Sequence, residues 1–194
     1  MNMNSLFLFF DTETTGVPRN YKAPVSDSDN WPRLVQLGWI LTDGEGNETK
    51  SCNYIIRPEG FTIPAEAAKL HGITTERALA EGVSLLEVLQ EFADDLNGVP
   101  NIVGHNIEFD KNIVAAEFYR NSMPHRFDKW KSYCTMHAST NYCAIKGPYG
   151  FKWPKLMELH KKLFGRPFED AHNAFADIKA TKDCFWEMRS RKLI

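Results

Sequence analysis

The chain has 194 residues, a formal net charge of −2, and 43% hydrophobic and 25% charged residues. This length fits one domain, and the composition excludes a disordered, collagen-like or coiled-coil protein, so we expect a single domain over residues 1–194. The near-neutral charge lacks the overall basic character of sequence-specific DNA-binding proteins. Any contact with nucleic acid must therefore be local or assisted by metal ions.

The apolar stretches are too short for a membrane span. The longest, Leu6–Phe10, has five residues, whereas a spanning helix needs about 20, and no basic segment of a signal peptide precedes it. The four cysteines have neither Cys-x-x-Cys spacing nor the density of a disulfide scaffold, which favours a reduced, cytoplasmic protein. Cys134, His137 and Cys143 fit no common zinc finger, so we interpret these thiols as buried or incidental.

The first third of the chain predicts strands around one irregular segment. Ser5–Phe10 is an apolar run that stops at Asp11, as expected of a central strand buried on both faces. Residues 17–33 hold three prolines and a cluster of Asp, Ser and Asn, which predicts a long irregular connection. Leu34–Thr42 and Glu48–Ile56 flank Gly and Asn turn residues and predict an antiparallel hairpin.

Helices are expected in the middle of the chain. Pro64–Leu70 and Thr74–Ala80 predict short helices. Ser84 and Glu87 have the spacing of a capping box at the start of a longer helix that runs through Leu96.

The second half alternates between strands and helices. Asn101–Gly104 predicts a strand that leads into a helix continuing to about Arg120, and another strand is expected around Tyr133–Met136. Helices are expected at Pro154–Phe164 and from about Asn173 to Arg189. Strands interleaved with helices, together with one hairpin, predict an α/β domain with a mixed sheet, in which active sites lie at the carboxyl ends of strands.

Two acids follow the first predicted strand. Because side chains alternate along an extended backbone, Asp11 and Glu13 project to the same side. Thr14-Thr15-Gly16 comes next, with polar and small residues that allow a sharp turn and bring backbone N–H groups near a ligand. An acidic pair of this kind is by itself more often a solvated strand end. Its significance depends on the motifs that follow.

A histidine and an acid lie near the start of the last predicted helix. His172 and Asp177 would be about 140° apart on one helix and could not share a site. We therefore expect Asn173 to cap the helix, Asp177 to face the sheet from its first turns, and His172 to lie in the preceding loop, where a proton-transfer group is suited. Asp110, near the start of an earlier helix, is by itself an ordinary favourable acid at a helix N-terminus.

Together these segments resemble the DEDDh-type 3′-to-5′ exonucleases, the family of the bacterial polymerase III proofreading subunit. The resemblance extends from Leu6 to about Met188, and it implies a ribonuclease H-like α/β fold: a five-stranded mixed sheet, flanked by helices, with an antiparallel second strand. It is carried by Asp11-Thr12-Glu13-Thr14-Thr15-Gly16, Gly104-His105-Asn106-x-x-Phe109-Asp110 and His172-Asn173-Ala174-x-x-Asp177, with Ile63-Pro64 and His71-Gly72-Ile73-Thr74 in addition.

The resemblance implies that Asp11, Glu13, Asp110 and Asp177 hold two divalent cations, Mg2+ or Mn2+, and that His172 is the general base. The chemistry of the residues agrees, because clustered carboxylates without cations repel, raise one another's pKa and favour hard cations. Two-metal sites serve in-line displacement at phosphorus. The implied reaction is hydrolysis at the 3′ end of single-stranded DNA, of the proofreading or repair type, with release of nucleoside 5′-monophosphates.

Six further positions match substrate contacts of the family. Thr14 would contact the terminal nucleotide through its backbone, and Val17 would wedge against the terminal bases. Val17 is smaller than the bulky residue often found at that position, and Phe109 also fits a plain core residue. Leu70, His71 and Phe109 would line the base pocket, and Asn106 is a further expected substrate contact.

Residues 146–166 carry six basic residues against one acid, interleaved with aromatic residues. Aromatic stacking combined with phosphate neutralisation holds single strands without sequence preference. We therefore expect strand contacts from Lys146, Tyr149, Lys152 and Trp153. Lys161 and Lys162 fit a solvated helix face equally well.

Three other functions fit parts of the pattern. An exoribonuclease that trims RNA 3′ ends would use the same acids, because the 2′-hydroxyl is sensed by a few local contacts. An inactive nucleic-acid-binding module is disfavoured, since all five motif residues are present. A polymerase-tethered subunit is disfavoured because little chain follows Arg189. We expect a free-standing enzyme that acts on nucleic acid with a free 3′ end.

Overall fold

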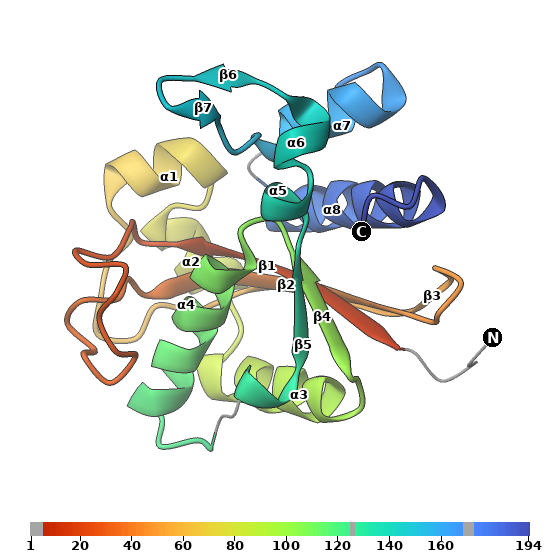
Figure 1. Cartoon of the computed structure of the whole chain (residues 1–194). Coiled ribbons are helices and arrows are strands. Elements are labelled where there is room, and N and C mark those ends of the chain that lie inside the picture. The colour runs from red at the N-terminus through yellow and green to blue at the C-terminus, as the bar shows by residue number, and fades with distance from the viewer. Residues whose placement is uncertain (1–5, 125–126, 169–172) are drawn as a thin grey trace.

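The computed structural model describes residues 6–124, 127–168 and 173–194. Its centre is a five-stranded sheet in the order β3-β2-β1-β4-β5 (Figure 1). Strand β2 is antiparallel to β1 and β3, whereas β4 runs parallel to β1 and β5, which confirms the predicted mixed sheet. The strands are β1 (Phe7–Thr14), β2 (Leu34–Thr42), β3 (Glu48–Ile55), β4 (Asn101–Gly104) and β5 (Lys131–Cys134).

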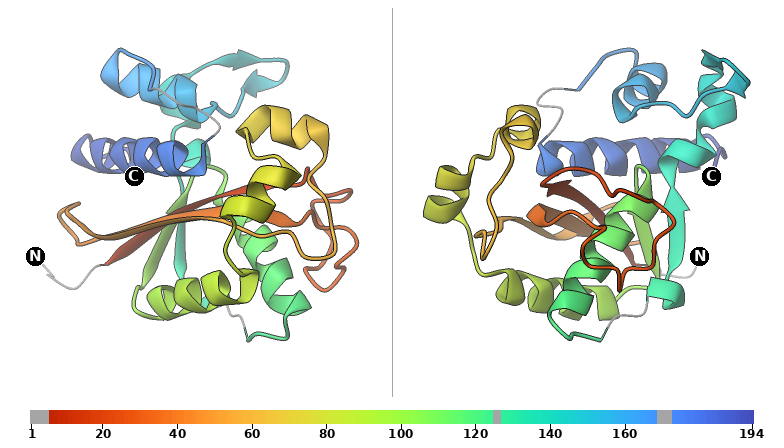
Figure 2. Two further views of the ribbon diagram at one scale, coloured as in Figure 1. Left: turned by 180° about the vertical axis from the view of Figure 1, so that it is seen from behind. Right: turned by 90° about the vertical axis from the view of Figure 1, so that its left-hand side faces the viewer.

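Helices cover both faces of the sheet, with α3 and α4 on one side and α8 on the other (Figures 1 and 2). Among the described residues, none of these helices combines the length and apolar character needed to cross a bilayer. The helices are α1 (Ala65–His71), α2 (Thr75–Glu81), α3 (Leu85–Asn97), α4 (Ile107–Arg120), α5 (Thr135–Ala138), α6 (Thr140–Cys143), α7 (Leu156–Phe164) and α8 (Ala174–Ser190), with a 3-10 turn at Phe127–Lys129 and a small hairpin of β6 (Lys146–Gly147) and β7 (Gly150–Phe151).

Strand β1 is buried on both faces, as its apolar run predicts. Leu8 and Phe10 belong to the core cluster that includes α3 and α4, whereas Phe7 and Phe9 pack in a second cluster with α8. The strand does not end at Asp11 as expected, because β2 continues to pair with it as far as Thr14. On its other edge, β1 pairs with β4 only through Phe9.

One predicted helix cap and two predicted boundaries differ from the structure. The Ser84 side chain makes no cap hydrogen bond at the start of α3, so the capping-box prediction was wrong. The strand expected around Tyr133–Met136 is β5 (Lys131–Cys134), because its pairing with β4 begins at Lys131. Helix α7 begins at Leu156, two residues after Pro154.

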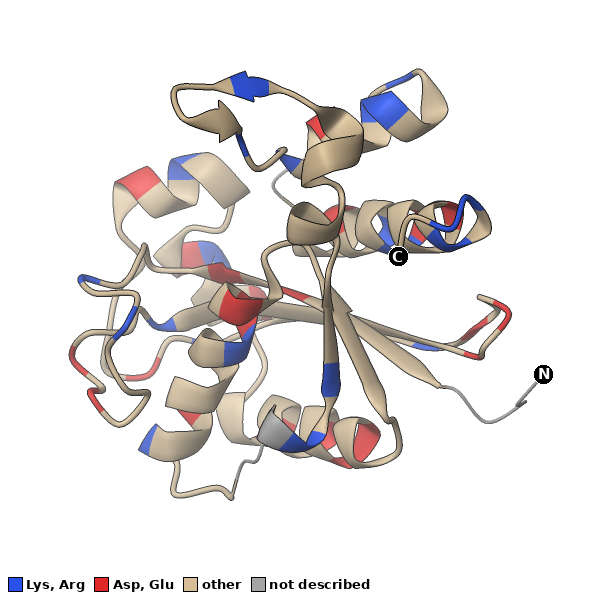
Figure 3. Cartoon of the chain, in the orientation of Figure 1, with Lys and Arg blue, Asp and Glu red and all other residues tan. Residues whose placement is uncertain are grey.

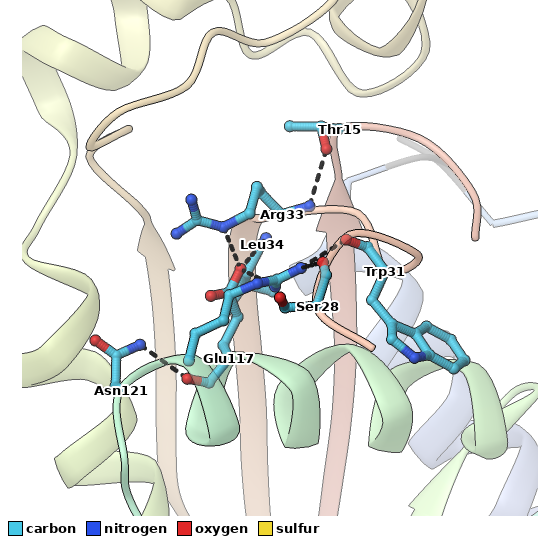
Figure 4. A network of polar contacts seen from close by, with 8 residues as sticks. Thr15, Ser28, Trp31, Arg33, Leu34, Glu117 and Asn121 are labelled. Atoms are coloured by element: carbon cyan, nitrogen blue, oxygen red, sulfur yellow. Dashed lines mark hydrogen bonds and ion pairs between the residues drawn. The ribbon is translucent and has the colours of Figure 1, made fainter. Parts of the chain in front are cut away.

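The irregular connection between β1 and β2 is fastened to α4 by a buried ion network (Figure 4). The carboxylate of Glu117, which is completely buried, accepts a hydrogen bond from Arg33 Nε at 2.9 Å and lies 3.0 Å from Arg120 Nη1. Arg120 Nη2 in turn donates to the backbone carbonyls of Ser28 and Trp31 at 2.6 Å each. The long connection therefore has a defined position beside α4.

Candidate active site

Three carboxylates meet at the carboxyl end of β1. Asp11 and Glu13 lie on the face of the strand that α8 covers, and Asp177 lies in the first turn of α8. One oxygen from each of these three acids lies within 4.8 Å of the others. The side chain of Asn173 accepts hydrogen bonds from the backbone N–H groups of Phe175 (3.1 Å) and Ala176 (3.4 Å). The expected helix cap and the expected approach of Asp177 are both found.

A glycine that the motif analysis did not single out allows this approach. Gly38 of β2 lies opposite Asp11 in the strand register. A Cβ atom at Gly38 would lie 2.6 Å from the Cδ1 atom of Ile178, the residue after Asp177. Glycine inside a predicted strand often marks such a close approach, so the Leu37-Gly38-Trp39 sequence carried a signal that could have identified it.

Asp110 reaches the site from the opposite helical layer. It is buried at the start of α4, and its Oδ1 atom accepts hydrogen bonds from the backbone N–H of Thr12 at 3.0 Å and from the Thr12 hydroxyl at 2.7 Å. Because β4 no longer pairs with this part of β1, the carboxylate occupies the open strand edge. Asp110 stands outside the group of three within 4.8 Å, but its charge acts on both Asp11 and Glu13.

The acids raise one another's pKa in their buried setting. Burial is the largest cause for Asp11, whose pKa is well above its usual value, and the charges of the neighbouring acids add to it. Burial followed by the charges of Asp177 and Asp110 raises the pKa of Glu13 to about 8. Burial raises the pKa of Asp110 to about 7, although the hydrogen bonds from Thr12 oppose the shift. The cluster therefore favours bound protons or cations over free negative charge.

His172, the expected general base, lies outside the described residues.

The residues expected near the substrate differ in their surroundings. Val17 and Leu70 are exposed, whereas Asn106 and Phe109 are half-buried. Asn106 is the N-cap of α4 and adopts a left-handed conformation with φ of 73°. Phe109 packs against the main core cluster, with its ring 6.5 Å from that of Tyr21.

Thr14 and His71 lie together behind the end of β1. Thr14 is buried, and its hydroxyl donates to the carbonyl of Gly16 at 2.6 Å. His71 is buried too, and its Nδ1 atom accepts a hydrogen bond from the N–H of Ile73 at 3.1 Å. Burial lowers the pKa of His71, with the backbone of Thr14 opposing the shift. Because Nδ1 accepts the hydrogen bond from Ile73, the ring proton lies on Nε2, which is buried without a hydrogen-bond partner among the described residues.

The expected strand contacts in residues 146–153 lie on the small hairpin. Lys146 and Tyr149 are exposed, and Trp153 is largely exposed. Lys152 is instead held by Glu158, to whose two carboxylate oxygens its Nζ atom donates at 2.7 and 2.9 Å. Its charge is therefore largely compensated within the protein.

The model of the protein family described as Exonuclease (RNase_T) matches residues 8–185 of this chain. No curated protein sequence matches the chain.

Solved structures of exonuclease I share the fold. The Escherichia coli enzyme in complex with a dA16 oligonucleotide is 24% identical, with a TM-score of 0.75 over 97% of this chain and 42% of that chain. The zinc-bound form of its complex with single-stranded DNA is 25% identical, with a TM-score of 0.74 over 97% of this chain and 41% of that chain. The enzyme from Methylocaldum szegediense is 23% identical, with a TM-score of 0.74 over 97% of this chain and 41% of that chain. The likeness confirms the predicted ribonuclease H-like fold, and this chain spans about two fifths of the length of these structures.

Proposed function

Because this chain belongs to the exonuclease family, we propose that it is a metal-dependent 3′-to-5′ exonuclease that releases nucleoside 5′-monophosphates from single-stranded DNA. The observation that carries the proposal is the meeting of Asp11, Glu13 and Asp177 within 4.8 Å at the end of the central strand. The similar structures with dA16 and dT13 oligonucleotides support single-stranded DNA as the substrate. We propose that residues 1–194 form one such domain, so activity is expected from the chain alone.

The acidic cluster fits divalent cations. Its donors are all carboxylate oxygens, the ligands preferred by Mg2+ and Mn2+. Raised pKa values also mean that a cation can replace protons that the cluster would otherwise bind. We assign two ions to Asp11, Glu13, Asp110 and Asp177. When bound, such ions lower the pKa of water and stabilise a leaving oxygen.

The chain's own residues orient the substrate and move a proton. From its position in the third motif, His172 is the proposed general base: it takes a proton from water while the new phosphorus–oxygen bond forms and the bond to the 3′-oxygen breaks. The leaving oxygen receives its proton from solvent. Val17 and Leu70 present exposed apolar surface to the terminal nucleotide. The remaining proposed contacts are the backbone of Thr14 and the side chains of His71, Asn106 and Phe109.

The test uses matched DNA strands labelled at the 5′ or the 3′ end. Digestion from the 3′ end predicts a shrinking ladder from the 5′-labelled strand and a released mononucleotide from the 3′-labelled strand. EDTA should stop both reactions, and Mg2+ or Mn2+ should restore them. The same strands made of RNA test the exoribonuclease alternative.

Asp177→Asn should abolish digestion, whereas Asp183→Asn, an exposed acid on the same helix, should not. Hydrolysis that resists EDTA, or full activity of Asp177→Asn, would reject the proposal.

A further inference from the structure

The hairpin β6–β7 stands on the side of the molecule where β1 ends. Figure 1 places it above α1, and the right-hand view of Figure 2 shows α1 and the hairpin on either side of the carboxyl end of β1. Its two strands contain two residues each, and the N–H of Lys152 closes its base by donating to the carbonyl of Ile145 at 2.9 Å. The hairpin and the residues that flank it, 145–153, therefore form a projecting arm beside the acidic cluster.

The arm exposes three aromatic rings. Tyr149 is fully exposed, Phe151 is 52% exposed and Trp153 is 63% exposed. The ring of Trp153 packs beside that of His137, with 4.9 Å between the centroids, so one side is supported while much of its surface faces solvent. Large apolar side chains gathered at one exposed place are typical of a binding surface.

The charge of the arm is uniformly positive. Residues 144–157 contain three lysines and no acidic residue. Lys152 is engaged by Glu158, but Lys146 and Lys155 are exposed. Figure 3 shows Lys and Arg positions, and no acidic position, on the hairpin β6–β7. Exposed rings beside cations are the combination that holds a single strand regardless of its sequence, because every base can stack and every nucleotide carries a phosphate.

A histidine of the second motif holds the arm in place. The Nε2 atom of His105 lies 3.0 Å from the carbonyl oxygen of Pro154, and its Nδ1 atom lies 3.0 Å from the hydroxyl of Thr135. Burial lowers the pKa of His105 to about 4, so the ring is neutral and donates from Nε2 to the carbonyl. His105 precedes Asn106, the N-cap of the helix that carries Asp110. One loop thus ties the base of the hairpin to the acidic site.

We propose that the hairpin is a second subsite, where the rings of Tyr149, Phe151 and Trp153 stack on bases upstream of the 3′ end and Lys146 contacts phosphate. The occupant is the single DNA strand whose 3′ end lies at the acidic cluster, so the subsite rests on the proposed function. It contributes to the binding of long strands and not to that of a single nucleotide.

The central experiment compares a long and a minimal substrate. The double variant Tyr149→Ala/Phe151→Ala removes two exposed rings. Its KM for an oligo(dT) of roughly 12 nucleotides should rise at least about fivefold, with little change in kcat. Hydrolysis of the p-nitrophenyl ester of thymidine 5′-monophosphate, which has no upstream base, should be unchanged. An unchanged KM for the oligonucleotide, or an equal effect on both substrates, would overturn the proposal.

Two controls isolate stacking from folding and from general apolar contact. Tyr149→Phe keeps the ring and should behave as the wild type, and Tyr119→Ala removes an exposed ring at the far end of α4 and should change neither substrate. Lys146→Ala should reduce the slope of log affinity against log salt by about 0.7, the value for one phosphate contact on a single strand. Melting temperatures should be the same in all variants.

Binding in EDTA separates failure of this proposal from failure of the proposed function. Fluorescence anisotropy of a 5′-labelled oligo(dT) measures affinity where no hydrolysis is expected. If the wild type hydrolyses neither substrate, the nuclease assignment fails, yet weaker binding by Tyr149→Ala/Phe151→Ala still supports the subsite. Equal affinity of the wild type and the double variant in EDTA overturns the subsite whatever the activity.

Discussion

The carboxylate of Asp110 accepts two hydrogen bonds from Thr12, one from the backbone N–H at 3.0 Å and one from the hydroxyl at 2.7 Å. The contact joins α4 to β1 at the point where β4 has stopped pairing with that strand. The side chain of Asp110 thus takes the place of a neighbouring strand, and the two hydrogen bonds fix it next to Asp11. Thr12, which lies between the two strand acids but faces the other layer, is therefore a positioning residue for the site.

Thr12→Val removes the hydroxyl donor and keeps the side-chain shape suited to a strand. The lost hydrogen bond to a buried carboxylate should lower the free energy of unfolding by about 1–3 kcal/mol and raise the pKa of Asp110, which that hydroxyl now lowers. The acid limb of the kcat–pH profile should shift to higher pH, and kcat should fall. Thr12→Ser keeps a hydroxyl at this position and should therefore keep the wild-type kcat and the wild-type kcat–pH profile. A Thr12→Val profile that superimposes on the wild type would contradict this role.

The raised pKa values predict a stability that depends on pH and cations. The pKa of Glu13 rises from 4.5 to about 8, so between these values the folded state binds more protons than the unfolded state. The contribution of the cluster to the free energy of unfolding therefore falls as pH rises through this window. Divalent cations replace the protons, so Mg2+ should raise Tm more at pH 8 than at pH 5.

Asp177→Asn isolates this effect by removing one of the repelling charges. In EDTA at pH 8 its Tm should exceed that of the wild type, the difference should shrink at pH 5, and the Tm gain from Mg2+ should be smaller. Asp183→Asn, exposed on the same helix, is the matched control and should follow the wild type. The mechanism is contradicted if Mg2+ raises the wild-type Tm equally at both pH values.

The periodicity of the sequence was sufficient to predict one side of the site. The two-residue alternation of β1 places Asp11 and Glu13 on one face, and Asn173 caps the helix whose first turn brings Asp177 to them. These relations are local, so they can be derived from strand and helix geometry.

Relations between distant segments could not be derived in the same way. The length of β1 depends on pairing with β2, and the bond between Thr12 and Asp110 depends on where β4 ends. The hairpin at residues 146–151 was missed because strands of two residues have no alternating pattern to detect. Sequence therefore identified the chemical groups better than the contacts that position them.

The close approach of α8 to the sheet can be tested at Gly38. Gly38→Ala would place a Cβ atom 2.6 Å from Ile178 Cδ1, so the buried side chain of Ile178 must move and disturb the packing next to Asp177. Overpacking should cost about 1–3 kcal/mol in the free energy of unfolding and should reduce kcat. Ile178→Val removes that Cδ1 atom, so the double variant Gly38→Ala/Ile178→Val should regain kcat relative to Gly38→Ala. Additive losses in the double-mutant cycle would mean that the two side chains do not compete for the same space.

The buried carboxylate of Glu117 predicts how the connection between β1 and β2 supports the substrate site. Glu117→Gln leaves Arg33 and Arg120 without their shared negative partner, and removing one member of a buried ion pair costs about 3–5 kcal/mol. The free energy of unfolding from urea titration should fall accordingly. Glu81→Gln, in the exposed pair with Arg77, is the matched control and should lose less than about 1 kcal/mol.

The same network bears on substrate binding, because Arg33 also pairs with Thr15 through two hydrogen bonds of 2.9 Å. Loosening this contact frees the segment that carries Val17, which is proposed to touch the terminal bases, but it leaves the acids on β1 paired with β2. Glu117→Gln should therefore raise KM for oligo(dT) more than it lowers kcat, measured at a temperature where the variant is folded. A fall in kcat at constant KM would instead place the network's influence on the acids themselves.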